Sequence, residues 1–327
     1  MVNQHIFASV VIPIYNESEN IQPLYEILTP VLAHTFSSYE IIYVDDCSTD
    51  DSLAKLKDLH SRDEHIKVIA LCRNFGQTAA LACGFDYAKG DIIISMDGDM
   101  QHDPRDIPVL LKALTPEVDI VSGWRKHRTD PFLSRKLPSA IANLIIRKLS
   151  GVNVHDFGTT LKIYRSHIIK NINLYGGHHR FIPALARQLG AKITEVPIKN
   201  IPRKRGKSKY SIFRTFQVLL DLITIKYMLS YAHRPIYIFG FIGLILSVPG
   251  IILLGYLGVE KLIFHIHLSQ HHLPLLLLSI LLVVLGIQFV TFGLLGENQL
   301  RIYHEVQNKP IYIVKQVFDN YEKSINS

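Results

Sequence analysis

Cysteine is scarce in this chain of 327 residues, which has only Cys47, Cys72 and Cys83. Their spacing is irregular and all three lie in the N-terminal half, which argues against a disulfide framework. We therefore expect reduced, structural thiols in a domain that faces the cytosol.

The glycine-rich nucleotide motifs are missing as well. No Gly-x-Gly-x-x-Gly follows an expected strand, so a nicotinamide or flavin enzyme has little support. Gly206-Lys207-Ser208 is similar to the end of a phosphate-binding P-loop, but Ile201 stands where that motif needs a glycine. A histidine cluster within residues 265–272 lacks a ligand scaffold, and we interpret it as a polar loop.

Charged residues are absent from two apolar runs, Pro235–Val259 and Leu273–Gly296. Each is long enough to cross a hydrocarbon core, which needs roughly 20 residues of helix. A buried core helix is the alternative for a single run, but two runs joined by a short loop favour a membrane hairpin. That loop carries only Glu260 and Lys261, whereas basic residues flank the hairpin, so the positive-inside rule predicts that both termini are cytosolic.

The net charge of +7 also reflects the basic residues that gather beside the apolar runs. Attraction to anionic lipid headgroups explains this clustering better than binding to nucleic acid. We therefore expect a multi-pass protein of the inner (plasma) membrane with no nucleic-acid partner. The residues concerned are Arg203, Lys204, Arg205, Lys207, Lys209, Arg214, Lys226 and Arg234 before the first run, and Arg301, Lys309 and Lys315 after the second.

The first part of the chain alternates apolar, β-branched runs with helical patterns. Near-continuous apolar strands between helices predict an α/β fold with a mostly parallel sheet covered on both faces. Ligands of such sheets bind beyond the carboxyl ends of the strands. The expected strands are Ala8–Ile14, Ile41–Val44, Ile66–Leu71, Ile92–Met96 and Ile120–Ser122, and the expected helices are about Glu19–Phe36, Asp51–Arg62, Thr78–Lys89 and Asp106–Leu114.

Beyond residue 125 the pattern is looser. We expect a helix near Ser139–Leu149, strands at Thr160–Tyr164 and Lys192–Val196, and a helix at Phe181–Leu189. Ser211–Ala232 has helical apolar spacing directly before the first apolar run, which predicts an interfacial helix in the membrane plane. The expected division is a cytosolic domain (1–210), juxtamembrane amphipathic helices (211–234), two transmembrane helices (235–298) and a cytosolic tail (299–327).

Asp97-Gly98-Asp99 directly follows the apolar run that ends at Met96. Two carboxylates around a glycine at a strand end can point at one place beyond the sheet. Hard cations such as Mg2+ or Mn2+ take oxygen ligands and share them with substrate phosphates. A simple strand-to-turn corner is the alternative. Other residues expected at the same edge are Pro13, Tyr15, Asn16, Glu17, Asp45 and Asp46.

Three segments resemble glycosyltransferase family 2: residues 9–17 (SVVIPIYNE), 44–50 (VDDCSTD) and 97–104 (DGDMQHDP). Residues 134–135 (SR), 155–158 (HDFG), 203–211 (RKRGKSKYS) and the paired apolar runs resemble its polyprenyl-phosphate branch. This branch includes dolichol-phosphate mannose synthases and bacterial polyprenyl-phosphate glucosyl- and aminoarabinosyl-transferases. The resemblance implies a doubly wound, nucleotide-sugar-binding sheet of the GT-A type, followed by interfacial helices and a transmembrane hairpin.

The resemblance also implies a donor site and a divalent metal, Mg2+ or Mn2+. Asp99 would be the main metal ligand, with Asp97 and Gln101. A cation that bridges the diphosphate would neutralise the charge on the leaving nucleotide. The implied donor-site residues are Pro13, Tyr15, Glu17, Asp45, Asp46, Asp97, Gln101 and Arg125.

For the acceptor phosphate, the resemblance implies Arg135 and Ser139. It adds Arg203, Arg205 and Lys209 on a loop that closes over the phosphates, where arginine suits a bidentate grip. Attraction to lipid headgroups is the alternative for this loop, and both interpretations can hold together.

The resemblance implies a catalytic set of Asp97, Asp99, Arg135 and Asp156. In this set, Asp156 would be the catalytic base. A phosphate monoester has a second pKa near ~6 and is largely dianionic at neutral pH, so no hydroxyl proton has to be removed. We therefore favour a positioning role for Asp156, such as orienting an arginine of the acceptor site.

The function implied is metal-dependent, inverting transfer of one hexose from a nucleoside-diphosphate sugar to polyprenyl phosphate at the cytosolic face. Glucose from UDP-glucose is the first expectation, GDP-mannose remains open, and a homo-oligomer is expected. One alternative is a processive polysaccharide synthase, but the only tryptophan, Trp124, lies outside a Gln-x-x-Arg-Trp motif. The other is a non-catalytic membrane scaffold, against which the retention of both Asp97 and Asp99 argues.

Overall fold

The structure is a computed structural model that describes residues 6–126, 143–144, 146–147, 150–174, 178–199, 201, 235–263, 272–306 and 310–319. The chain divides into two compact units. The first comprises Met1–Leu222 together with Pro310–Ser327, and the second is Ile223–Lys309.

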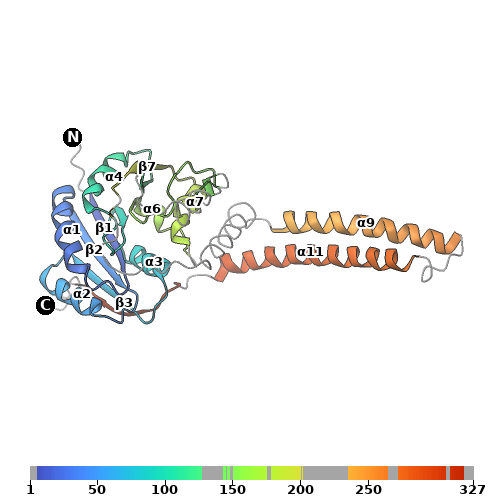
Figure 1. The fold of residues 1–327 in the computed structure, drawn as a ribbon, viewed down its shortest axis with the longest axis horizontal. Helices are drawn as coiled ribbons and strands as arrows, with labels where there is room; N and C mark the ends of the chain where they lie inside the picture. Colours follow the sequence, from blue (N-terminus) through green and yellow to red (C-terminus); the bar gives the residue numbers. More distant parts are fainter. Residues whose placement is uncertain are drawn as a thin grey trace. The chain divides into compact units, whose positions relative to one another are not determined.

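A mixed sheet forms the centre of the first unit, and within the described residues its strand order is β7-β5-β6-β4-β1-β2-β3-β8 (Figure 1). The pairs β1–β2, β1–β4, β2–β3 and β5–β7 are parallel, whereas β6 and β8 run antiparallel to their neighbours. The strands are β1 Phe7–Ile14, β2 Ser38–Asp45, β3 Ile66–Leu71, β4 Ile92–Ser95, β5 Ile120–Trp124, β6 Lys162–Arg165, β7 Ile193–Pro197 and β8 Val314–Phe318.

Helices cover both faces of this sheet. Helices α1, α2 and α4 bury apolar side chains in one cluster, which includes Val10 and Ile12 of β1. Helices α3, α6 and α7 bury apolar side chains in a second cluster, which includes Val11 of β1. Because successive strand residues point to opposite faces, β1 contributes to both cores. The helices are α1 Ile21–Thr35, α2 Ser52–Arg62, α3 Gln77–Tyr87, α4 Ile107–Ala113, α6 Ser166–Ile169 and α7 Ile182–Gln188, with short 3-10 helices η1 Pro104–Asp106 and η3 His178–Phe181.

Strand β8 returns the chain to the first unit after the second apolar helix, and it pairs with β3. Beside it, the Cys72 N–H donates a hydrogen bond to the Ile313 carbonyl at 2.9 Å. Tyr312 packs into the core on the α3 face, and its hydroxyl donates to Asp86 Oδ2 at 2.8 Å. The sequence predicts a tail over residues 299–327. Part of this segment, Val314–Phe318, is instead an edge strand of the sheet.

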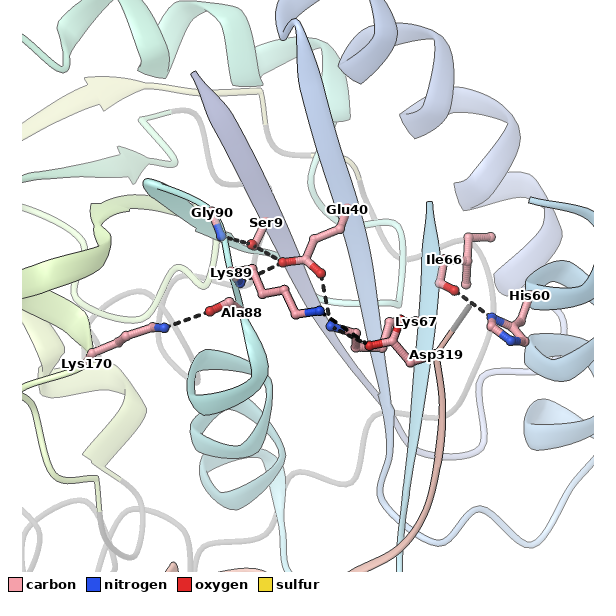
Figure 2. Close-up of polar contacts among 10 residues, drawn as sticks. All are labelled: Ser9, Glu40, His60, Ile66, Lys67, Ala88, Lys89, Gly90, Lys170 and Asp319. Carbon is pink, nitrogen blue, oxygen red and sulfur yellow. Dashed lines mark hydrogen bonds and ion pairs between the residues drawn. The ribbon is translucent and has the colours of Figure 1, made fainter. Parts of the chain in front are cut away.

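A buried charge network joins the end of β8 to the sheet (Figure 2). Lys67 on β3 is 4% exposed, and its Nζ lies 3.2 Å from Glu40 Oε2 and 3.2 Å from Asp319 Oδ2. Glu40 Oε1 accepts hydrogen bonds from the Ser9 hydroxyl at 2.6 Å and from the Lys89 N–H at 2.7 Å. The network therefore links β1, β2, β3 and β8 near the amino ends of the parallel strands.

The second unit contains two long helices, α9 Pro235–Ile263 and α11 Leu273–Val306. Their stretches Phe239–Ile263 and Leu273–Gly296 are long and apolar enough to cross a membrane, and only 17% and 11% of an apolar 18-residue window in each are buried within the structure. Apolar surface all around a helix is typical of a membrane span. The helices approach closely at a small-residue contact, because a Cβ on Gly286 would lie 2.6 Å from the Gly243 carbonyl oxygen.

Candidate active site

A cavity of about 490 Å³ opens at the carboxyl ends of β1, β2 and β4. This is the edge where ligands bind in parallel α/β sheets, and the volume falls within the range of small-molecule sites. The residues that line it are Pro13, Ile14, Tyr15, Glu17, Asp46, Asn74, Gly76, Gln77, Ala80, Asp97, Gly98 and Asp99.

The cavity begins where β1 and β4 stop pairing. Their ladder ends at Val11 and Ser95, and the last hydrogen bond runs from the Met96 N–H to the Val11 carbonyl at 3.1 Å. Pro13 is the next β1 residue on the side of β4, and it has no N–H to extend the ladder. The two strands can therefore separate at this position and leave room for a ligand.

Gly98 lets the two aspartates approach the end of β1. A Cβ at this position would lie only 2.5 Å from Ile14 Cδ1, so a larger residue would require the end of the Ile14 side chain to shift. With glycine in place, Asp97 and Asp99 both line the cavity.

The chemistry of this pair fits a divalent cation that is shared with a substrate. Mg2+ typically takes one or two carboxylates and completes its shell with water and substrate phosphates. Within the residues that the structure describes, no group of three or more His, Cys, Asp or Glu side chains could hold a metal by itself. The Asp97–Asp99 pair therefore suits an open site better than a closed structural one.

Asp99 is oriented by the turn that follows it. The Gln101 N–H donates to Asp99 Oδ1 at 3.1 Å, and Met100 between them has a left-handed φ of 58°. The backbone of Gln101 therefore orients Asp99. The role of the Gln101 side chain as a metal ligand stays a prediction.

Asp97 is held by Gln77, the first residue of α3. Gln77 Nε2 donates to Asp97 Oδ1 at 2.6 Å. Burial raises the pKa of Asp97, whereas the nearby Thr160 hydroxyl, the charges of Arg125 and Lys162 and the hydrogen bond from Gln77 oppose this rise. A cation bound at this carboxylate would favour its ionised form further.

Asp46 fixes the start of α3. Its Oδ1 accepts a hydrogen bond from the Phe75 N–H at 2.7 Å, and its Oδ2 accepts one from the Gly76 N–H at 2.8 Å. Burial raises the pKa of Asp46, and these two hydrogen bonds oppose the rise. Gly76 has a φ of 92°, a conformation that favours glycine, and α3 begins at the next residue.

Asp45 is buried beside Asp46, but it does not line the cavity. Its Oδ2 accepts a hydrogen bond from the Ser48 N–H at 3.2 Å, and burial raises its pKa. In the same region, Asn16 Oδ1 accepts a hydrogen bond from the Thr49 N–H at 2.8 Å. These contacts hold together the loops that follow β1 and β2.

Arg125 and Asp156 form a two-point ion pair. Arg125 Nε lies 2.7 Å from Asp156 Oδ2, and Nη2 lies 3.1 Å from Oδ1. The Gly158 N–H also donates to Oδ1 at 3.1 Å, and Asp156 is 3% exposed. Both oxygens are thus engaged, an arrangement typical of a carboxylate that orients an arginine.

Two buried basic residues near this pair were not selected from the sequence. His102 Nε2 lies 3.1 Å from Thr159 Oγ1, and burial together with the charge of Arg125 lowers the pKa of His102 to about 4. Lys162 donates to the Thr159 carbonyl, and burial lowers its pKa to about 8. At neutral pH His102 is therefore neutral, whereas Lys162 remains mostly charged and offsets the charges of Asp97 and Asp156.

The structure brings together only part of the predicted site. Pro13, Tyr15, Glu17, Asp46, Asp97 and Asp99 line the cavity, whereas Asp45, Gln101 and Arg125 do not. The acceptor-site residues lie outside the described residues, as does the interfacial segment 211–234. These acceptor-site residues are Arg135, Ser139, Arg203, Arg205 and Lys209.

Sequence reasoning missed the contribution of the segment that follows β3. This segment and the first turn of α3 line the cavity with Asn74, Gly76, Gln77 and Ala80. The rule that ligands gather at the carboxyl ends of parallel strands applies to β3 as well, and it could have found them.

Comparison with known proteins gives the family. The sequence model described as "Glycosyl transferase family 2" matches residues 9–172. A dodecaprenyl-phosphate galacturonate synthase of Rhizobium johnstonii is 39% identical over 325 residues, which cover 98% of this chain and 96% of that protein. The chain belongs to glycosyl transferase family 2.

Further similarities extend this assignment. An undecaprenyl-phosphate 4-deoxy-4-formamido-L-arabinose transferase of Photorhabdus laumondii is 36% identical over 319 residues, which cover 97% of this chain and 96% of that protein. The resemblance to the polyprenyl-phosphate branch of family 2 is thereby confirmed.

Solved structures show the same fold. Glucosyl-3-phosphoglycerate synthase from Mycobacterium tuberculosis, crystallised with Mn2+, UDP and glucosyl-3-phosphoglycerate, has a TM-score of 0.53 at 18% identity. The match covers 68% of this chain and 80% of that chain. At this identity the similarity speaks for the fold alone, and the predicted GT-A type of α/β sheet is confirmed.

Proposed function

We propose that this family 2 glycosyltransferase moves one sugar from a nucleoside-diphosphate sugar to the phosphate of a polyprenyl lipid, at the cytosolic face of the membrane. One observation carries the proposal: the Asp97–Asp99 pair lines a cavity at the sheet edge, in a chain similar over nearly its whole length to polyprenyl-phosphate sugar transferases.

The cavity offers suitable contacts for the donor nucleotide. Tyr15 is 46% exposed at the cavity, so its ring can stack on a nucleobase. Asp46 and Glu17 supply acceptors for N–H and hydroxyl groups. The N-terminus of α3 also reaches the cavity, and its partial positive charge favours the donor's diphosphate.

Asp97 and Asp99 are the residues that would hold Mg2+ or Mn2+, with the diphosphate and water as the other ligands. Such a cation supplies Lewis-acid chemistry, which neutralises the charge that develops on the leaving nucleotide. The aspartates themselves orient the diphosphate through this contact. Gln101 remains the third proposed ligand.

Transfer with inversion is part of the proposal, because an acceptor phosphate and a leaving diphosphate in line would occupy opposite faces of the sugar. Arg135 and Ser139 are the proposed contacts of the acceptor phosphate, and Arg203, Arg205 and Lys209 would close over it. Arg125, fixed by Asp156, can add positive charge beside the donor.

Strand β8 supports a hairpin with both ends on one side of the membrane. Along the sequence, both apolar helices stand between segments that belong to the first unit, because β8 follows α11 in the chain and pairs with β3. If α9 and α11 span the bilayer, the chain has to return to the compartment that contains the sheet. This connection agrees with the positive-inside rule.

The identity of the donor sugar determines which lipid-linked product the protein makes. Glucose is the sugar expected from the sequence, and galacturonic acid is the second candidate because of the relative that is 39% identical. Purified full-length protein, undecaprenyl phosphate and Mn2+ would be incubated with radiolabelled UDP-glucose, UDP-galacturonic acid, UDP-4-deoxy-4-formamido-L-arabinose or GDP-mannose. We expect one UDP-sugar to give a lipid-linked product that EDTA abolishes. The absence of product with every donor would contradict the proposal.

Asp156→Asn should retain measurable turnover. If Asp156 only orients Arg125, the isosteric amide retains one acceptor, and we expect a loss of about tenfold or less. Removing a general base instead costs roughly 10²–10⁴-fold. The measurement is kcat at saturating donor and acceptor.

A double-mutant cycle with Arg125→Met supplies the control for this test. Asp156→Asn should add little to Arg125→Met if the carboxylate acts through the arginine. Independent losses in the two variants, with unchanged melting temperatures, would favour the base.

A further inference from the structure

Asn74–Gln77, which we name the bridge segment, connects the ends of the two strands that flank β1. The order β4-β1-β2 places β1 in the middle of the cavity's floor. Toward β2, the backbone of the bridge segment donates to both oxygens of Asp46, at 2.7 and 2.8 Å. Toward β4, Gln77 Nε2 donates to Asp97 at 2.6 Å.

We propose that Gln77 is a positioning residue for the cation site: its carboxamide holds the Asp97 carboxylate, and Asp46 fixes the backbone from which Gln77 reaches. This inference rests on the proposed function, because the cation and nucleotide are those of the donor complex. Gln77 is uncharged and lies outside Asp97-Gly98-Asp99, so this acidic motif does not point to it.

The first turn of α3 is rigid enough for this role. Asp46 holds its start, and the next residue after Gln77 is also fixed, because Thr78 Oγ1 lies 2.7 Å from His179 Nδ1 of η3. Thr78 is buried and the contact is partly shielded from water. With the backbone held on both sides of Gln77, its side chain has a fixed origin and a defined partner.

The chemistry of the contact leaves Asp97 able to bind a metal. A carboxylate has about four lone-pair positions, and an amide N–H occupies one of them. Gln77 adds no charge that would repel a cation. A fixed carboxylate binds a metal more tightly than a rotating one, because less side-chain freedom is lost on binding.

Gln77→Met tests this role, because methionine keeps the length and helix propensity but removes the donor. The full-length protein in detergent would be titrated with UDP, and in parallel with GDP, with and without Mn2+ by calorimetry. We expect the dissociation constant with Mn2+ to rise about tenfold, as for a lost hydrogen bond to a charged group. Without Mn2+ it should change less than about twofold, because Gln77 acts on Asp97 and not on the nucleoside.

Gln22→Met on α1 is the matched control. Gln22 makes the same type of contact, Nε2 to Glu26 Oε1 at 2.9 Å, but it does not line the cavity. This variant should bind the nucleotide like the wild type under both conditions.

Three results would overturn the inference in distinguishable ways. Unchanged Mn2+-dependent affinity in Gln77→Met would show that Asp97 needs no support. Equal weakening with and without Mn2+ would show that Gln77 shapes the pocket or contacts the nucleotide. If the wild type binds neither UDP nor GDP with Mn2+, the proposed function fails, and this inference fails with it. Gln77→Ala repeats the test if Gln77→Met does not fold.

Discussion

Asp99→Ala is expected to reduce sugar transfer by about 10³-fold or more, because it removes the main proposed oxygen ligand from the cavity. Of the pair, Asp97 alone would remain, so the cation would lose one of its two charged protein ligands. The measurement is the initial rate of lipid-linked product formation at saturating donor, with Mn2+ and nucleotide binding measured separately.

The fold should survive this substitution. Asp99 is only partly buried, and the Gln101 N–H that donates to it belongs to its own turn. Asp58→Ala is the control, because Asp58 is an exposed carboxylate on α2 that pairs with Arg62. It should leave the rate unchanged. A variant Asp99→Ala that folds normally and keeps a tenth of the wild-type rate would rule out this aspartate as the main ligand.

The cavity edge could be predicted because the strands around it are nearly continuous apolar runs. Ile66–Leu71 is predicted to the residue, and the loops after β1, β2 and β4 carry the acidic residues that line the cavity. Period and composition identify such buried strands well, and the rule for parallel sheets then gives the location of the ligand.

Strand partners and side-chain contacts could not be predicted in the same way. The sequence predicts a strand at Thr160–Tyr164, and β6 spans Lys162–Arg165. Its place between β4 and β5 and its antiparallel direction depend on long-range packing. Strand β8 has polar residues at Lys315 and Gln316, as is common on a sheet edge, and its pattern resembles a tail. The Gln77 contact depends on where α3 begins, which Asp46 sets from another loop.

Lys67→Met is expected to destabilise the first unit by about 3–5 kcal/mol, the usual cost of removing one partner from a buried ion pair. Lys67 is the shared cation of Glu40 and Asp319, and its side chain is 5% exposed. Without it, Glu40 Oε2 and Asp319 face each other with less compensation, and the hold of β8 on β3 weakens. Thermal unfolding of the full-length protein in detergent would measure the loss, expected at roughly 10 °C.

Cys83 supplies a local readout of the same change. Its thiol is fully buried on α3, and burial raises its pKa to about 12, so it should react very slowly with a maleimide in the wild type. Release of the segment around Tyr312 would expose it, and peptide-resolved mass spectrometry should then find faster labelling of Cys83 in Lys67→Met.

Arg62→Met is the matched control for Lys67→Met. The Arg62–Asp58 pair is shorter, at 2.6 Å, but its side chains are 65% and 52% exposed, so its removal should change stability by less than about 1 kcal/mol. The double variant Glu40→Gln with Lys67→Met should recover part of the loss, because one of the two carboxylate charges that Lys67 compensates is then gone. If Lys67→Met unfolds like the control, burial of this network contributes nothing to the attachment of β8.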